Sequence, residues 1–326
     1  MKTTTGPTIA VALLGLVLFH FGCGAVHRAS PSAHPVASTG VGGQRCDVNA
    51  GMRVVLLGTG TPNADPARSG PASAVVLDGQ AYLVDCGPGV VRRAAAAHEQ
   101  GVTALAMPNL ERVFITHLHS DHTLGLPDLI FSPWVLERIA PLEVFGPPGT
   151  AEMVRHIEQA WTQDVHIRIE GLEPANASGH RAVVHEIKPG VIYRDDHVKV
   201  TAFPVKHGDW THAFGYRFDS ADRSIVFSGD TVPCDSLVEA ARGCDVLVHE
   251  VYSTAGFARR TPDWQKYHAA SHTSSAELGR IASQIRPRLL VLYHQLYWGT
   301  SDEDLLAEVR QHYDGHVVSG KDLDMY

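Results

Sequence analysis

The sequence contains no cluster of lysine and arginine, and its acidic residues outnumber the basic ones by 35 to 27. Beyond residue 49 the imbalance is larger, because 24 basic residues stand against 34 acidic ones, a net charge of about −10. A domain with a net negative charge gains no long-range attraction to a phosphate backbone, so the composition argues against a nucleic-acid partner. Hydrophobic residues at 44% and charged residues at 19% are ordinary for a soluble globular protein.

The sequence also lacks an apolar run long enough to span a bilayer with ease. Its N-terminal run, residues 9–21, follows Lys2 and precedes small residues that suit a signal peptidase. We therefore expect residues 1–25 to be a signal peptide and the Pro-, Ser-, Gly- and Ala-rich residues 26–49 to be a flexible linker. Residues 50–326 would then be the folded domain, exported to the periplasm or secreted. The competing interpretation is a buried N-terminal helix.

Cysteine is sparse, with five residues, and their spacing does not decide how they are used. Cys23 follows Gly22, which leaves a lipid anchor open as an alternative to simple cleavage. An exported chain could pair Cys46, Cys86, Cys234 and Cys244. Cys234 and Cys244 bracket one short helical segment and form the favoured pair, whereas Cys86 is expected to pack as a free thiol.

Apolar runs and turn residues predict an alternation of strands and helices in the folded domain. Strands are expected at residues 52–58, 74–77, 81–84, 113–115, 142–145, 166–169, 183–187, 198–205, 214–218, 224–227, 245–250, 288–293 and 317–318. Helices are expected at 90–100, 126–136, 150–161, 236–242, 274–285 and 302–312. Residues 254–270 show no periodicity and are interpreted as a lid.

The densest group of potential metal ligands lies in residues 116–125, Thr-His-Leu-His-Ser-Asp-His-Thr-Leu-Gly, directly after an apolar β-run. Side chains at i and i+2 of an extended chain share a side, so His117 and His119 can share one cation. Asp121 and His122, beyond the bend, can reach a second. Imidazole and carboxylate together are the ligand set of zinc and similar ions. The competing interpretation, a chance cluster on a solvated loop, is disfavoured by the tight spacing.

Further polar residues follow apolar β-runs elsewhere in the chain: His207, Asp230, Glu250 and His294. Strand ends that carry such residues converge at one edge of a layered α/β fold, where sites form. His207, Asp230 and His294, together with the four donors of residues 116–125, make seven ligands, which suit two metal ions bridged by a carboxylate. Asp230 is the natural bridge, because it stands alone on a Gly-flanked turn. Taken singly, His207 would be a packing residue and Asp230 a turn residue.

The pattern His-x-His-x-Asp-His-x-x-Gly, followed by Val-Lys-His207, Ser-Gly-Asp230-Thr and Tyr-His294, resembles the metallo-β-lactamase superfamily. The likeness runs from about residue 52 to the C-terminus and is greatest to the ribonuclease Z group and its arylsulfatase-like relatives. It implies an α/β fold, an αββα sandwich of two mixed β-sheets flanked by helices. It also implies two zinc ions, with Mn²⁺ or Fe as alternatives, one held by His117, His119 and His207, the other by Asp121, His122 and His294, and Asp230 between them.

Two more residues resemble the carboxylate–imidazole pair with which that group protonates the leaving group: Glu250 in Val-His-Glu and His272 in Ser-His-Thr-Ser-Ser-Ala. We expect Glu250 to set the tautomer of His272, and His272 to act as the general acid. The counterpart of Asp121 is also credited with activating the attacking water. In the competing interpretation His272 is a solvated helix-cap neighbour and Glu250 a surface carboxylate.

One departure from the ribonuclease Z group bears on the substrate. Members resemble each other in a long basic arm that grips tRNA after the Gly-Tyr-Arg strand, whereas here residues 219–223 lead straight into the next β-run. With the acidic balance and the export signal, this favours an exported dizinc metallohydrolase of a small ester: a sulfate ester, a phosphodiester or a lactone. Metal-bound hydroxide would be the nucleophile. The alternatives are a ribonuclease Z-type tRNA 3′-endonuclease and a non-catalytic metal-binding carrier, and a homodimer stays open.

Aromatic residues could line the substrate pocket. Trp210 and Trp298 are favoured because each lies within four residues of a predicted ligand. The wider set is Trp134, Trp161, Trp210, Trp264, Tyr267, Tyr297 and Trp298.

Overall fold

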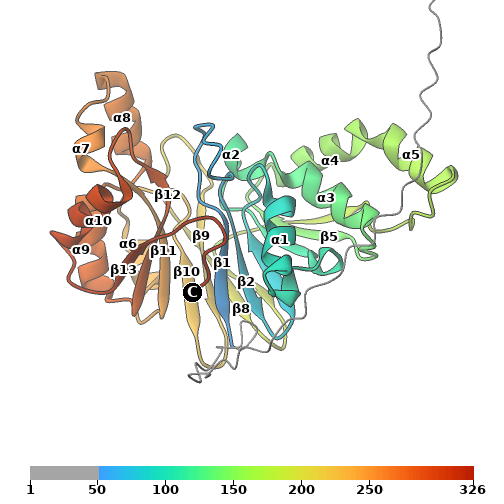
Figure 1. Ribbon diagram of the computed structural model, residues 1–326, viewed down its shortest axis with the longest axis horizontal. Coiled ribbons are helices and arrows are strands. Elements are labelled where there is room, and N and C mark those ends of the chain that lie inside the picture. The colour runs from blue at the N-terminus through green and yellow to red at the C-terminus, as the bar shows by residue number, and fades with distance from the viewer. Residues whose placement is uncertain (1–50) are drawn as a thin grey trace, which may run out of the picture. The chain divides into compact units, whose positions relative to one another are not determined.

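The computed structural model describes residues 51–326, in which two β-sheets lie face to face with helices on their outer faces (Figure 1). The six-stranded sheet has the order β1-β2-β3-β4-β5-β6, and the seven-stranded sheet has the order β13-β12-β11-β10-β9-β8-β7. Both sheets mix parallel and antiparallel pairs: β3 to β6 run parallel to one another, as do β10 to β13, and the other pairs are antiparallel. This is the predicted αββα sandwich. The predicted signal peptide, residues 1–25, and linker, residues 26–49, lie outside the described residues.

The first sheet consists of β1 (Arg53–Gly58), β2 (Ala72–Leu77), β3 (Gln80–Val84), β4 (Arg112–Phe114), β5 (Leu142–Gly146) and β6 (Ala182–Glu186). The second consists of β7 (Gly190–Arg194), β8 (Lys199–Pro204), β9 (Phe214–Asp219), β10 (Ser224–Phe227), β11 (Val246–Tyr252), β12 (Leu289–Leu296) and β13 (Val317–Ser319). The helices are α1 (Val90–Glu99), α2 (Ser120–Thr123), α3 (Leu126–Val135), α4 (Thr150–Ala160), α5 (Thr162–Glu170), α6 (Asp235–Ala240), α7 (Thr254–Phe257), α8 (Pro262–Ser271), α9 (Ser275–Ile285) and α10 (Asp302–Arg310). Two 3₁₀ turns, Thr103–Leu105 and Met107–Asn109, precede β4.

Three apolar layers hold the sandwich together. The central layer lies between the sheets and is rich in aromatic rings, such as Phe114, which packs edge-on against Phe218 at 5.5 Å between ring centroids. A second layer joins the first sheet to α1 and α3, and a third joins the second sheet to α6, α9 and α10. Successive side chains of each strand therefore pack in two different layers, because they point to opposite faces of the sheet in turn. In residues 51–326, no helix has the length and apolar character needed to cross a membrane.

One local prediction was wrong. Residues 166–169 were expected to be a strand but belong to α5, because Val165 and Ile169, one helical turn apart, pack on the core beside α3. Residues 254–270, which showed no periodicity in the sequence, are mostly helical and form α7 and α8. The carboxylate of Glu308 accepts hydrogen bonds from the backbone amides of Thr254 and Ala255 at the start of α7. Neither the packing of α5 on the core nor the contact of Glu308 with α7 is visible in the local periodicity of the sequence.

The favoured disulfide was also wrong, because Cys234 and Cys244 are both unpaired. Cys86 is a buried free thiol, as predicted, and burial raises its pKa well above the usual range. Cys46 lies outside the described residues.

A buried arginine compensates for a proline inside α3. Pro133 has no amide hydrogen, so the carbonyl of Leu129 loses its helical donor. Arg138, which is completely buried, donates from Nη1 to that carbonyl at 2.9 Å and to the carbonyl of Leu110 at 2.8 Å. Its Nη2 donates to the carbonyls of Ile130 and Gly179 at 2.7 and 2.9 Å. Burial lowers the pKa of Arg138 to about 10, and it stays charged at neutral pH.

We expect the Arg138→Met substitution to lower the free energy of unfolding by roughly 3 kcal/mol or more, since each buried carbonyl left unpaired costs about 1–3 kcal/mol. Urea denaturation followed by circular dichroism measures the change. Arg92→Met is the matched control, because Arg92 also contacts the α3 helix, through Asp128, but is exposed. A midpoint of Arg138→Met equal to that of the control would contradict this account.

Candidate active site

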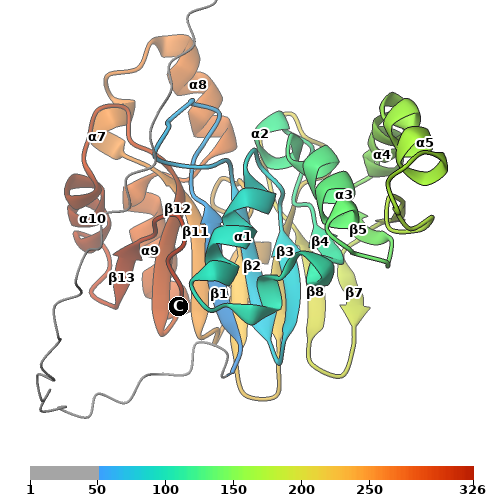
Figure 2. The same ribbon diagram turned by 45° about the vertical axis from the view of Figure 1, so that its right-hand side comes forward.

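The predicted ligands come from four strands and the segments that follow them. His117 and His119 lie in the loop after β4, and Asp121 and His122 lie on the short helix α2 that follows. His207 follows β8, and Asp230 follows β10 on a turn in which Gly229 has a φ of +60°. Figure 2 shows α2, α7 and α8 at the same end of the two sheets, and Figure 1 shows the same arrangement. The edge that the sequence predicted is therefore the edge where these residues meet.

His294 reaches this edge through an irregularity in β12. Along β11 and β12, Glu250 pairs with Tyr293 and Val251 pairs with Gln295, so His294 is one extra residue. It is a β-bulge, and its backbone has a φ of +46°, in the left-handed region. The sequence predicted a strand that ends before His294, whereas β12 continues to Leu296. The bulge aims the ring at Asp121 and Asp230 without ending the strand.

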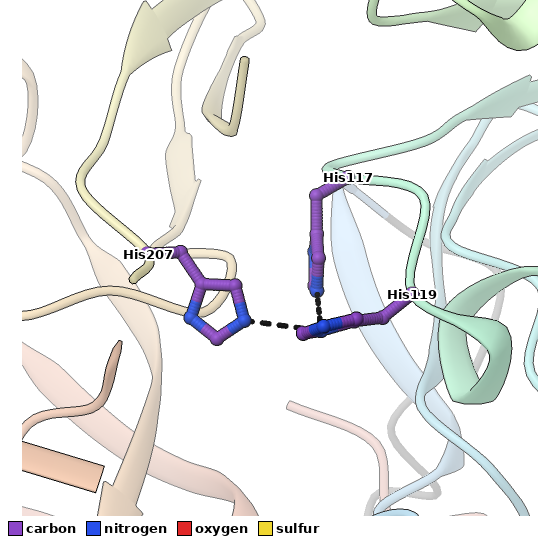
Figure 3. Close-up of side chains that lie close together, drawn as sticks. All are labelled: His117, His119 and His207. Atoms are coloured by element: carbon purple, nitrogen blue, oxygen red, sulfur yellow. Dashed lines mark hydrogen bonds between the residues drawn. The ribbon is translucent and has the colours of Figure 1, made fainter. Parts of the chain in front are cut away.

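Three imidazoles form the first group of donors. His117 Nε2 lies 3.0 Å from His119 Nδ1, and His207 Nε2 lies 3.1 Å from the same nitrogen (Figure 3). The three rings can hold a common cation, because their donor atoms lie within 4.8 Å of one another. Two nitrogens converging on a third at hydrogen-bond distance leave at least one lone pair unmatched, and a cation would satisfy all of them.

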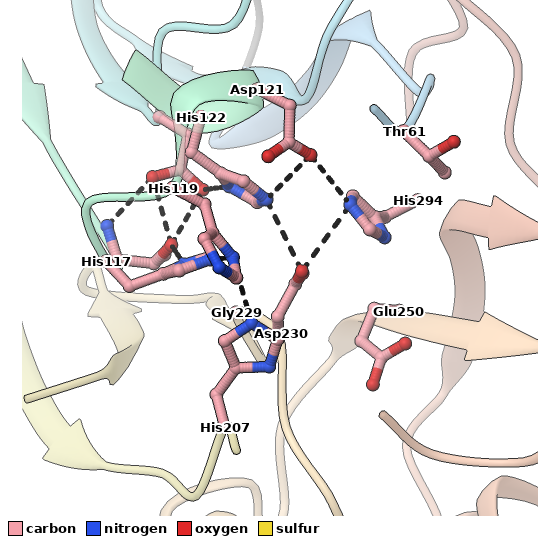
Figure 4. A network of polar contacts seen from close by, with 12 residues as sticks. Thr61, His117, His119, Asp121, His122, His207, Gly229, Asp230, Glu250 and His294 are labelled. Atoms are coloured by element: carbon pink, nitrogen blue, oxygen red, sulfur yellow. Dashed lines mark hydrogen bonds and ion pairs between the residues drawn. The ribbon is translucent and has the colours of Figure 1, made fainter. Parts of the chain in front are cut away.

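The second group surrounds Asp230 (Figure 4). Its Oδ2 lies 3.4 Å from His122 Nε2 and 3.4 Å from His294 Nε2. Asp121 Oδ2 lies 3.3 Å from His294 Nε2 and 3.6 Å from His122 Nε2. Asp230 Oδ1 and His122 Nε2 are buried and make no hydrogen bond within the described residues. A carboxylate oxygen and an imidazole nitrogen that are buried without a partner are costly, and both atoms suit coordination of a divalent metal ion.

Residues behind the ligands fix the orientation of several rings. Asp85 Oδ2 contacts His122 Nδ1 at 2.8 Å, and Asp85 Oδ1 accepts from the amide of Thr116 at 2.8 Å. His207 Nδ1 lies 2.7 Å from the carbonyl of Ser271. Contacts of this type hold a metal-binding imidazole in one tautomer. Asp85, which directly follows the predicted strand 81–84, is a site residue to which the sequence assigned no role.

Glu250 and His272 stand beside this cluster as a pair. Both are buried, and His272 Nδ1 lies 3.3 Å from Glu250 Oε2 and 3.9 Å from Asp230 Oδ2. Glu250 Oε1 accepts from the amide of Thr273 at 2.8 Å, which fixes the carboxylate. Burial lowers the pKa of His272 to about 4, while burial and then repulsion from Asp230 raise the pKa of Glu250 well above its usual range. The pair can thus keep one proton near neutral pH.

All nine predicted site residues therefore lie together at one end of the sheets. A family model described as the beta-lactamase superfamily domain matches residues 80–295. The chain belongs to the metallo-β-lactamase superfamily. It is accordingly a hydrolase of that superfamily, as the sequence predicted.

Curated relatives and solved structures agree with this assignment. The chain is 36% identical to the ribonuclease Z of Mycobacterium bovis (strain BCG / Pasteur 1173P2) over 280 residues. This alignment covers 83% of this chain and 96% of the relative. The ribonuclease Z of Mycobacterium marinum is 36% identical over 279 residues, 83% of this chain and 97% of the relative. The fold is similar to that of YhfI, a metallo-β-lactamase fold protein from Bacillus subtilis, with a TM-score of 0.64 and 18% identity over 84% of this chain and 98% of YhfI. Human tRNase Z, short form, gives a TM-score of 0.62 and 23% identity over 84% of this chain and 98% of that chain.

These relatives contradict the prediction of a hydrolase of small esters for which nucleic acid is an unlikely substrate. Their ribonuclease Z names, over nearly their whole length, favour the alternative that the sequence analysis ranked second. The prediction gave too much weight to the net charge of the whole chain. A site that gathers metal ions carries its own positive charge, which a count of side chains does not include. The short connection was observed correctly, since Ser220 and Arg223 close a tight turn between β9 and β10.

A cavity of about 480 Å³ opens beside the cluster of ligands. Five of the predicted site residues line it: His119, Asp121, Asp230, His272 and His294. Of the predicted aromatic residues, Trp264, Tyr267 and Trp298 line it. Trp210 lies elsewhere beside the cluster, where its Nε1 donates to His119 Nε2 at 2.8 Å, and Trp134 is buried in the core.

Proposed function

We propose that this hydrolase is a dizinc ribonuclease of the ribonuclease Z type, which cleaves a phosphodiester bond at the 3′ side of a tRNA precursor. The observation that carries the proposal is the 36% identity to ribonuclease Z that extends over 96% of the relative's length. The close array of imidazole and carboxylate donors supports it, because such arrays suit hydrolysis of a phosphodiester.

His117, His119 and His207 would hold one zinc ion, Asp121, His122 and His294 the other, and Asp230 would lie between them. Bound metal ions at such a site lower the pKa of water and neutralise charge on the ester oxygens. Asp85 and the carbonyl of Ser271 keep His122 and His207 in the orientation that ligation requires. Asp121, at the cavity wall, is placed to accept a proton from an attacking water.

The leaving oxygen of the ester needs a proton, and His272 is placed to supply it. Glu250 faces Nδ1 of His272, so the other ring nitrogen, Nε2, is left for the substrate. His272 lines the cavity, whereas Glu250 does not. A carrier protein without turnover has no use for a proton donor of this kind, so the pair favours an enzyme over the non-catalytic alternative.

The test is cleavage of an in vitro transcribed tRNA precursor with a 3′ extension by the zinc-loaded protein. We expect one endonucleolytic cut next to the tRNA body, lost on treatment with a chelator and restored by zinc. A transcript of the same length without a tRNA fold is the control and should be cut far more slowly. The proposal is wrong if bis(p-nitrophenyl) phosphate is hydrolysed while the precursor stays intact at excess enzyme. Zinc binding with no turnover of either compound would instead support the carrier.

A further inference from the structure

One wall of the cavity is built by the residues between α7 and α8, by α8 itself and by the residues that follow β12, and it contains a cation with no carboxylate partner in the described residues. Arg260 lines the cavity, and within residues 51–326 no ion pair joins its guanidinium to a carboxylate. Its Nε is buried and makes no hydrogen bond in that part of the chain. In a protein with an excess of acidic residues, an arginine that lies beside a predicted active site without a carboxylate partner indicates that an anionic ligand binds there.

Two indole rings hold this guanidinium in place. The Cζ atom of Arg260 lies 5.4 Å from the centroid of Trp264 and 5.4 Å from the centroid of Trp298. Cation–π contacts of this kind orient a guanidinium without neutralising it, so its donors stay free for a phosphate. The arrangement suits an oxyanion of the substrate better than it suits a structural ion pair.

Trp298 has a strained backbone, with a φ of +46°, which a bulky residue rarely adopts. Arg259 Nη2 donates to its carbonyl at 2.9 Å, and Tyr252 packs on its ring at 5.6 Å between centroids. Strain that neighbouring contacts maintain next to a predicted active site indicates a functional position. Here it holds the indole against the cavity.

Trp264 offers a flat apolar surface at the mouth of the same cavity. Its indole stacks on His268, with 5.5 Å between centroids and 22° between planes, and the Arg260 guanidinium also lies over the ring. Trp264 nevertheless keeps 49% of its surface exposed, which is unusual for the largest apolar side chain. Single-stranded nucleic acids bind proteins by stacking bases on such exposed rings while a basic side chain contacts the backbone.

We propose that Trp264 and Arg260 form a subsite for one nucleotide of the RNA strand next to the cleaved bond, in which Trp264 stacks on the base and Arg260 binds its phosphate. This inference rests on the proposed function and adds to it the residues that grip the single-stranded end. A cavity of about 480 Å³ has room for one nucleotide and not for a double helix. The subsite thus selects unpaired RNA at the point of cleavage.

A double-mutant cycle on the zinc-loaded full chain tests the stacking contact. The precursor tRNA is compared with versions that carry one abasic nucleotide at the positions flanking the cut. Trp264→Ala should lower kcat/KM for the intact precursor roughly 5- to 150-fold, the range expected for one stacked base. At one flanking position the abasic precursor should be cut equally well by wild type and Trp264→Ala. Trp264→Phe should restore most of the activity, because it retains a ring.

Trp161→Ala is the matched control, since Trp161 has a similar exposure of 40% and does not line the cavity. The inference is overturned if Trp264→Ala matches this control, or if its loss is the same with every abasic precursor. For Arg260, the Arg260→Gln substitution should reduce the slope of log K against log salt by about 0.7, the effect of one lost phosphate contact on single-stranded RNA. An unchanged slope would remove Arg260 from the subsite.

Failure of the proposed function gives a different result. If wild type does not cut the precursor, binding of a fluorescein-labelled oligoadenylate of about ten nucleotides is measured by anisotropy. A weaker affinity of Trp264→Ala than of Trp161→Ala would then support the subsite without the tRNA-processing activity. Equal affinities of the two variants would overturn the subsite as well.

Discussion

Replacing His272 with alanine should lower kcat on a tRNA precursor by about 10²–10⁴-fold, the usual contribution of a general acid, while the metal content stays unchanged. The reason lies in the geometry: His272 lines the cavity, is held by Glu250 at 3.3 Å, and stands 3.9 Å from Asp230. Metal content is measured by elemental analysis of the purified protein, and kcat by single-turnover cleavage. His212→Ala, a change of an exposed histidine, is the control.

The leaving group distinguishes acid catalysis from a structural role. The p-nitrophenolate ion departs readily without a proton, whereas a sugar oxygen does not. His272→Ala should therefore lose much less activity on bis(p-nitrophenyl) phosphate than on RNA. Glu250→Gln should lie between wild type and His272→Ala, with a loss of about 10- to 100-fold, because it only positions the ring. Equal losses on both substrates would mean that His272 supports the metal site and is not the acid.

The sequence was most informative where the ligands are close together in the chain. The alternation of His117 and His119 and the bend before Asp121 are properties of one loop, so their convergence follows from strand geometry alone. The αββα arrangement followed from the resemblance that these motifs carry. The distant ligands His207 and Asp230 were found because each directly follows an apolar β-run.

Features that depend on tertiary contacts were missed. The bulge at His294 arises from the pairing of β11 with β12, which no local pattern shows. Asp85 directly follows the predicted strand 81–84, and only the fold places it 2.8 Å from His122. The helix α5 was taken for a strand, since its apolar face is defined by the core that it packs against. Arg260 appeared as one charge among many, because its lack of a carboxylate partner is a property of its surroundings.

The position of Asp230 leads to the second large expected effect. Asp230→Asn should lower the metal content of the purified protein and reduce kcat/KM at least about 1,000-fold, given that a metal ion contributes several kcal/mol to the transition state. Its carboxylate is buried and lies 3.4 Å from both His122 and His294. Although burial alone would raise the pKa of Asp230, the neighbouring His294 and His122 hold it well below the usual range, so the group is a carboxylate at neutral pH.

An amide of the same shape removes this charge but leaves the packing nearly unchanged, so a folding defect is separated from a metal defect. Circular dichroism should show the native fold in Asp230→Asn, while elemental analysis shows the metal loss. Asp235→Asn, a change of an exposed residue at the start of α6, is the matched control and should keep both metal and activity. Full metal content with wild-type cleavage in Asp230→Asn would show that the two groups of donors do not share this carboxylate. In that case His117, His119 and His207 would act as a separate site, and their substitution alone should leave the ion held by Asp121, His122 and His294 in place.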